Sequence, residues 1–190
     1  MKATRRILQG LIAMLATAAS HAAAQQSPSA SAAQRTQAIM ASFSKNKHVV
    51  KEKRGVRMEK YRDVASTPAI RSNPQDYAGR YQVEDMGLGF DIQVDSRGNV
   101  SGTGYEPVGE DTGVRRTYRL VNGKIDGALL TATQIYGDGT RDRFEGAFMN
   151  RTSKDSPTDT GTTQFGIGVM GRTVQLAGMT INKFFYRKID

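Results

Sequence analysis

The chain has 190 residues, a formal net charge of +9 and no cysteine or tryptophan. The lack of cysteine excludes disulfides, thiol chemistry and cysteine-ligated metal sites, so the fold must be held by its apolar core. Two histidines leave little material for histidine-based catalysis.

Residues 1–24 have the order of a secretory signal peptide: a basic start, an apolar run over about residues 7–19, and small residues up to Ala24. The apolar run is shorter than the roughly 20 residues that a membrane span needs. We therefore expect export to the periplasm or the exterior, cleavage near Ala24 and no transmembrane segment in the mature chain. Thr4-Arg5-Arg6 leaves the general and twin-arginine export routes both open.

The next two segments precede the folded domain. Residues 25–33 ("QQSPSASAA") are small and polar, which predicts a flexible leader. Residues 34–75 form a basic, partly helical arm and connector, with Ile39, Met40 and Phe43 spaced for one side of a helix that ends near Asn46. From there to about residue 64 the pattern is ambiguous between helix and strand.

Positive charge is concentrated in this arm. Removing the three signal-peptide cations leaves +6, whereas residues 76–190 hold fourteen Lys and Arg against fifteen Asp and Glu. Such a field favours anionic partners, namely an anionic envelope surface, an acidic glycan or an acidic protein. Nucleic acid is not expected outside the cytoplasm, and the alternative is a solvated structural face. The candidate anion- or partner-binding residues are Lys45, Lys47, Lys51, Lys53, Arg54, Arg57, Lys60 and Arg62.

Residues 76–190 are predicted to be an antiparallel β domain. "GFDIQVD" (residues 89–95) alternates apolar and polar residues, "SRGN" supplies a turn, and "VSGTGYEP" extends away again. No helix follows these glycines, so they belong to a hairpin and not to a phosphate-binding loop.

Short alternating runs separated by turn residues repeat to the C-terminus. Among these turns, Asn122-Gly123 predicts a two-residue hairpin in which Leu120 faces Ile125. Eight or nine short strands in a meander predict a mainly β fold closing into a small, about eight-stranded barrel, with an open sandwich as the alternative. "ALLTA" (residues 128–132) is apolar on both faces, so we expect the arm helix to cover the outside of that strand.

A resemblance accompanies this pattern. "AGRY" (residues 78–81), a following turn with glycine, and "SGTG" (residues 101–104) are similar in rhythm to avidin-like and lipocalin-like meander barrels. The similarity covers the first three strands of the domain. The chain lacks the tryptophans that those families favour, so the resemblance implies no ligand-binding site in this chain.

The sequence contains no recognisable catalytic, metal or cofactor constellation, so no cofactor is expected. Two long polar loops, Tyr105–Val114 and Thr152–Thr163, are candidates for function. If both lie at one barrel end, a small molecule would sit in the mouth beneath them, although these aromatics would equally serve as core. The candidate ligand-binding residues are Tyr105, Tyr118, Tyr136 and Phe165.

These observations predict a secreted or periplasmic, non-enzymatic binding module of the cell envelope. It would hold a small ligand, an anionic envelope component or a protein partner, and an inhibitor of a secreted enzyme falls within this class. The alternative is a cell-envelope hydrolase with a carboxylate pair that sequence alone does not identify.

Overall fold

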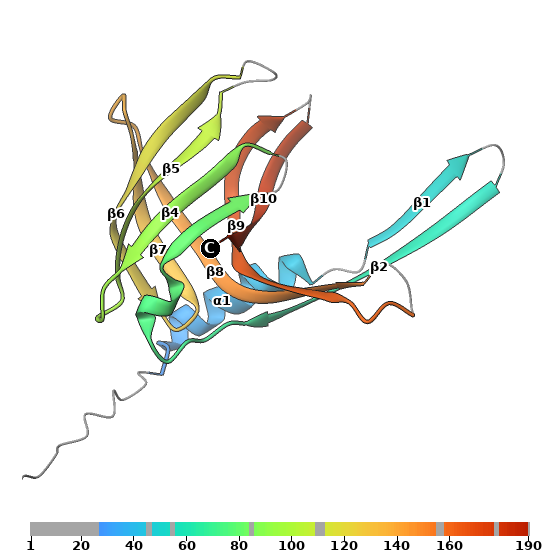
Figure 1. Ribbon diagram of the computed structural model, residues 1–190, viewed down its shortest axis with the longest axis horizontal. Helices are drawn as coiled ribbons and strands as arrows, with labels where there is room; N and C mark the ends of the chain where they lie inside the picture. Colours follow the sequence, from blue (N-terminus) through green and yellow to red (C-terminus); the bar gives the residue numbers. More distant parts are fainter. Residues whose placement is uncertain are drawn as a thin grey trace, which may run out of the picture.

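Eight consecutive strands, β3 to β10, close into an antiparallel barrel in the computed structural model of the chain (Figure 1). The structure describes residues 27–44, 47–53, 56–83, 86–108, 113–154, 158–176 and 179–189, of which 47–53, 56–63, 174–176 and 179 are described by their backbone alone. The barrel strands are β3 (Gly79–Val83), β4 (Leu88–Val94), β5 (Asn99–Pro107), β6 (Arg115–Asp126), β7 (Leu129–Tyr136), β8 (Arg141–Lys154), β9 (Thr162–Leu176) and β10 (Met179–Ile189).

Each barrel strand pairs with its chain neighbour, and one further pairing completes the ring. β10 returns to pair with β3, and β8 pairs with β7 along its first half and with β9 along its second. The predicted meander barrel is confirmed, and the open sandwich was wrong, because closure leaves no free edge among these eight strands.

The turn at residues 95–99 behaves as predicted. Asp95 accepts hydrogen bonds from the backbone amides of Arg97 and Asn99, both at 2.8 Å, and Gly98 has a φ of +76°. No helix follows, which confirms that "SGTG" belongs to a hairpin strand.

The predicted hairpin at Asn122-Gly123 was wrong. β6 runs through both residues, and the chain turns at Gly127 and Ala128, between the paired residues Asp126 and Leu129. Asn122 has a φ of +52°, and the register of β6 against β7 shifts at this point. The dipeptide therefore forms a β-bulge, which uses the same positive φ that a tight turn would use.

Aromatic side chains fill the barrel interior. Tyr81, Phe90, Phe148 and Tyr186 are at most 1% exposed, and the rings of Tyr81 and Phe90 stack with centroids 5.2 Å apart. Such a packed interior is typical of a barrel of this size. It stabilises the fold by apolar burial, and it leaves the outer surface and the barrel ends as places for ligands.

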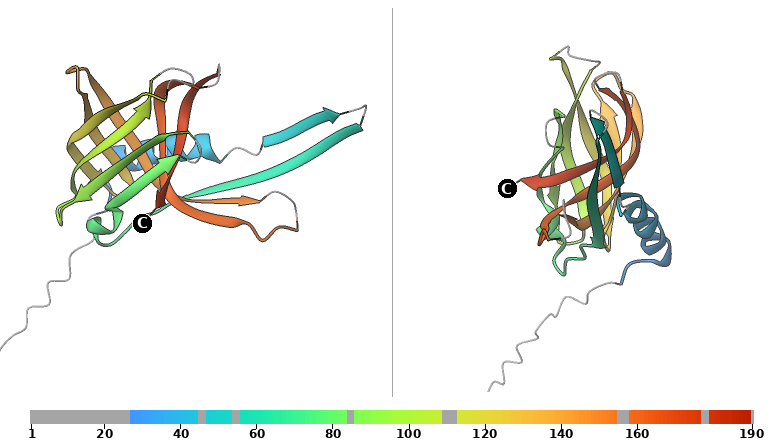
Figure 2. Two further views of the ribbon diagram at one scale, coloured as in Figure 1. Left: turned by 45° about the horizontal axis from the view of Figure 1, so that its top comes forward. Right: turned by 90° about the vertical axis from the view of Figure 1, so that its right-hand side faces the viewer.

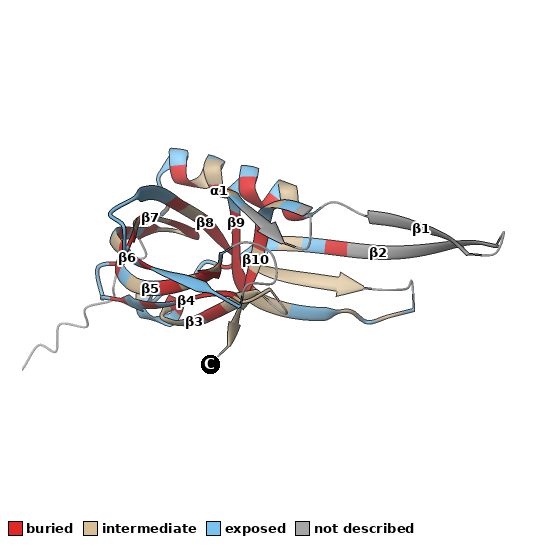
Figure 3. Ribbon diagram, turned by 90° about the horizontal axis from the view of Figure 1, so that it is seen from above, coloured by how far each residue is buried: buried red, intermediate tan, exposed pale blue. Residues whose placement is uncertain are grey.

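Helix α1 (Ala30–Phe43) lies along the outside of the barrel (Figure 3). It is capped by Ser29, so it begins earlier than Gln34, inside the predicted leader, and it ends at Phe43, before Asn46. Its buried residues pack against Leu129, Ala147 and Met149 on the outer face of β7 and β8. The expected cover over "ALLTA" is therefore confirmed: Leu129 faces the helix, while Leu130 faces the interior.

The ambiguous part of the arm forms a β-hairpin of β1 (Lys47–Lys53) and β2 (Val56–Pro68). Residues 63–68 of β2 pair with β8 beyond the point where β7 ends. The remainder of the hairpin extends away from the barrel (Figures 1 and 2). A short 3-10 helix, η1 (Pro74–Tyr77), then leads into β3.

Candidate functional site

A charged cluster closes the barrel interior near the β5–β6 connection. Glu106 on β5 is 3% exposed, and Arg116 and Arg172 both contact its carboxylate. The Tyr136 hydroxyl donates to Glu106 Oε1 at 3.0 Å, and Gln134 Nε2 donates to that hydroxyl at 2.6 Å. Because β5 and β9 stand on opposite sides of the eight-stranded ring, the Glu106–Arg172 ion pair ties two opposite walls together.

Burial sets the protonation of this cluster. Desolvation lowers the pKa of the Arg172 guanidinium below its ordinary value, partly offset by Tyr186. Desolvation raises the pKa of Tyr118 well above its ordinary value and also raises the pKa of Tyr136 and of Tyr186. The three phenols therefore stay neutral and act as hydrogen-bonding walls around the ion pair.

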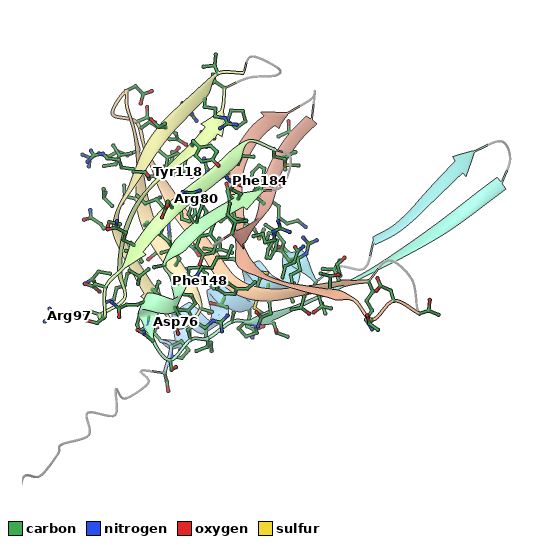
Figure 4. The ribbon with its side chains drawn as sticks, in the orientation of Figure 1. Asp76, Arg80, Arg97, Tyr118, Phe148 and Phe184 are labelled. Carbon is green, nitrogen blue, oxygen red and sulfur yellow. The ribbon has the colours of Figure 1, made fainter. Side chains whose placement is uncertain are left out.

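The four predicted ligand-binding aromatics do not share one mouth. Tyr118 and Tyr136 lie together with ring centroids 5.7 Å apart, toward the barrel end opposite Asp76 (Figure 4). Phe165 packs against Tyr81 and Phe148, and Tyr105 lies on the outer face of β5.

The two long loops cannot meet over these residues. In a meander, consecutive turns alternate between the two ends of the barrel, which puts the β5–β6 and β8–β9 connections at opposite ends. Residues 109–112 and 155–157 of these loops lie outside the described residues.

Most of the predicted basic residues lie in the paired strands β1 and β2. Among them, Lys45 and Arg54 lie outside the described residues, and the other six lie on the backbone of β1 and β2. Directly paired residues of an antiparallel ladder share one face. Lys47 pairs with Arg62, Val49 with Lys60, Lys51 with Met58, and Lys53 with Val56, all on one face. Arg57 pairs with Glu52 on the other face.

A groove of about 770 Å³ crosses the outer face of β3 to β7. Its lining includes three arginines, Arg80 on β3 and Arg115 and Arg119 on β6, together with Asp91, Tyr105 and Gln82. Outward-facing side chains of neighbouring strands form most of it, and the buried residues Phe90, Tyr118 and Tyr136 border it from the barrel side. The groove and the charged cluster therefore lie on opposite sides of the same two tyrosines.

Three of the four predicted ligand-binding aromatics, Tyr105, Tyr118 and Tyr136, line the groove, and Phe165 does not. The arginines of the groove and the charged cluster were not predicted from the sequence. Arg172 follows the inward-facing Phe165, Ile167 and Val169 at an odd offset, so alternation would point it outward. An irregularity in the pairing of β9 with β10 changes the alternation there, and the side chain is turned inward. Cross-strand neighbours such as Arg80 and Arg119 cannot be read from one sequence.

Within the described part of the chain, no group of three or more His, Cys, Asp or Glu is placed to hold a metal ion. No described helix has the length and apolar character that crossing a membrane requires. Comparison of the chain with known protein families, curated proteins and solved structures finds no match.

Proposed function

We propose that the chain is an exported, non-enzymatic binding module that attaches to an anionic surface of the cell envelope through the β1–β2 hairpin. The β-barrel is the folded body of this module, and a binding role is compatible with its filled interior. Export itself is proposed from the signal-peptide pattern of residues 1–24.

One observation carries the proposal: five cations share one face of the hairpin. Lys47, Lys51, Lys53, Lys60 and Arg62 belong to this set, which we call the basic face, and by register it contains no carboxylate. The hairpin extends from the barrel, so its basic face is placed to meet a surface that the barrel body need not touch (Figure 2). Each cation near an anionic membrane surface contributes about 1 kcal/mol, and salt screens the attraction.

The few apolar residues on the basic face, Val49, Val56 and Met58, indicate peripheral attachment without deep insertion. Binding should then depend on anionic headgroups and on ionic strength, and not on the acyl chains.

Three variants of equal charge change test the proposal. The hairpin variant carries Lys51→Gln, Lys53→Gln and Lys60→Gln. The control variant carries Arg97→Gln, Lys124→Gln and Arg143→Gln, three exposed positions outside both the hairpin and the groove. The groove variant carries Arg80→Gln, Arg115→Gln and Arg119→Gln.

The measurement is co-sedimentation of the mature chain, starting at Gln25, with phosphatidylglycerol-containing and neutral vesicles. The parent and the control and groove variants should bind the anionic vesicles at low salt and dissociate as salt rises. The hairpin variant should bind about a hundredfold more weakly, because three cations are lost. Equal binding by the hairpin variant, or no effect of salt, would refute the proposal.

A further inference from the structure

The groove on the outer face of β3 to β7 is built from two neighbouring rows of side chains. One row runs Arg80, Asp91, Thr103, Arg119 across β3, β4, β5 and β6. The next row runs Gln82, Gly89, Tyr105, Thr117 across the same strands. The second row rises less far above the sheet than the first, because Gly89 has no side chain and the threonine side chain is short.

Tyr105 forms the floor of this second row. Its hydroxyl occupies the space above Gly89, where an added Cβ would lie 2.5 Å from it, and it accepts a hydrogen bond from Gln82 Nε2 at 2.7 Å. The guanidinium of Arg115 lies over the Tyr105 ring, 5.1 Å from its centroid. The groove is thus lined by the phenol of Tyr105, the amide of Gln82 and threonine hydroxyls, and arginines surround these groups.

The three arginines carry more positive charge than the groove neutralises. Arg80 lies 3.8 Å from Asp91 in a pair whose two side chains are more than half exposed, a weak interaction in water. Arg115 and Arg119 make no ion pair with any described residue. A concave surface with unneutralised arginines is suited to carboxylate, sulfate or phosphate groups, which guanidinium binds with two parallel hydrogen bonds.

The spacing of the arginines selects the kind of anion. Arg80 and Arg119 are three strands apart in one row, which is about 14 Å at the ordinary spacing of strands. A single small anion cannot span that distance, whereas a chain with repeated negative groups does so.

The floor of the groove separates two classes of polyanion. Single-stranded nucleic acid is bound on exposed aromatic faces, on which the bases stack. Among the described lining residues, the Tyr105 ring is covered by Arg115, and Phe90, Tyr118 and Tyr136 are buried. The hydroxyl and amide groups of Thr103, Thr117 and Gln82 instead match the many hydroxyls of a sugar chain.

We infer that this groove is a binding site for an acidic oligosaccharide, that is, a sugar chain bearing carboxylate or sulfate groups. The chain would cross β3 to β6, with its acidic groups on Arg80, Arg119 and Arg115 and its sugar hydroxyls on the threonines and Gln82. This site is distinct from the hairpin and does not depend on the attachment to an anionic surface proposed above.

Calorimetric titration of the mature chain tests this inference with three probes: a heparin-derived decasaccharide, a neutral maltodextrin of similar length, and a 20-residue oligothymidylate. We expect the parent, the hairpin variant and the control variant to bind the decasaccharide, with no binding of the maltodextrin and at least tenfold weaker binding of the oligothymidylate. The groove variant should bind the decasaccharide at least tenfold more weakly than the control variant.

Several outcomes would overturn the site. These are equal binding by the groove and control variants, binding of maltodextrin as tight as that of the decasaccharide, oligothymidylate binding as tight or tighter, or full competition by an equal concentration of inorganic phosphate. The substituted arginines are exposed, so the groove variant should keep the parent's thermal midpoint, which separates lost binding from lost folding.

Discussion

The outer surface of the barrel has two contrasting faces. Over β7, β8 and β9 it carries Leu129, Ala147, Met149 and Gly168, and helix α1 covers it. Over β3 to β6 it carries arginines, threonines and Tyr105, and no described element covers it. Side chains alternate between inward and outward in the same way on both faces. The two faces therefore differ only in which residue types point outward.

The comparison shows how outward residues determine what a barrel wall does. On the helix side, Gly168 permits close contact, since an added Cβ would lie 2.7 Å from Phe43 Cε2. On the groove side, the absence of a side chain at Gly89 leaves room for the Tyr105 hydroxyl, and Tyr105 lines the polar groove. The first face packs against a helix and contributes to stability, and the second is left uncovered by the described residues, as the proposed binding site requires.

Removal of one partner of the Glu106–Arg172 ion pair should destabilise the protein more than any other change considered below. Glu106→Leu leaves Arg172 buried without its carboxylate, and we expect it to cost about 3–5 kcal/mol in the free energy of unfolding. The double variant Glu106→Leu/Arg172→Met should recover most of that loss, because no buried charge remains. Urea unfolding of the three proteins checks this. A double variant less stable than Glu106→Leu would show that the unpaired charge of Arg172 is not the cause of the loss.

The helix-covered face gives the next effect. Phe43→Ala removes a buried ring from the contact with Met149 and Gly168, and we expect a loss of about 3 kcal/mol. Thr103→Ala on the groove face should change stability by less than about 0.5 kcal/mol. Thermal and urea unfolding measure both. Similar losses at the two positions would erase the distinction between a structural and a binding face.

A smaller effect is expected from pH. Hydrogen bonds from Arg35 on α1 hold the pKa of Glu145 on β8 below its ordinary value, with a further contribution from Arg143. A lowered folded-state pKa stabilises the protein above the ordinary carboxyl pKa, and this stability is lost as the pH falls through the folded value. Glu145 is partly exposed, so about 1 kcal/mol is involved.

Urea unfolding at pH 6 and pH 3.5 measures this dependence. The parent should lose about 1 kcal/mol more than Glu145→Gln over that interval, while the remaining carboxylates act equally in both proteins. Parallel losses would mean that the Arg35–Glu145 contact does not fasten the helix to the barrel.

The features that sequence could predict are local. Alternation along one strand identified the barrel, and the double-sided run at Leu129 and Leu130 identified the helix-covered wall. The Asn122-Gly123 prediction was wrong because a bulge and a tight turn require the same positive φ. The groove and the cluster around Glu106 depend on pairings between strands and on an irregularity near Arg172, which appear only after the chain has folded.

If the hairpin binds an anionic vesicle surface and the groove binds an acidic sugar chain, we expect one molecule to hold both at the same time. Co-sedimentation of a labelled acidic decasaccharide with phosphatidylglycerol vesicles, at low salt and equimolar protein, tests this in one measurement. The parent and the control variant should carry the decasaccharide into the vesicle pellet, whereas the hairpin and groove variants should leave it in solution. Displacement of the parent from the vesicles by the decasaccharide, or equal transport by the groove variant, would contradict the account.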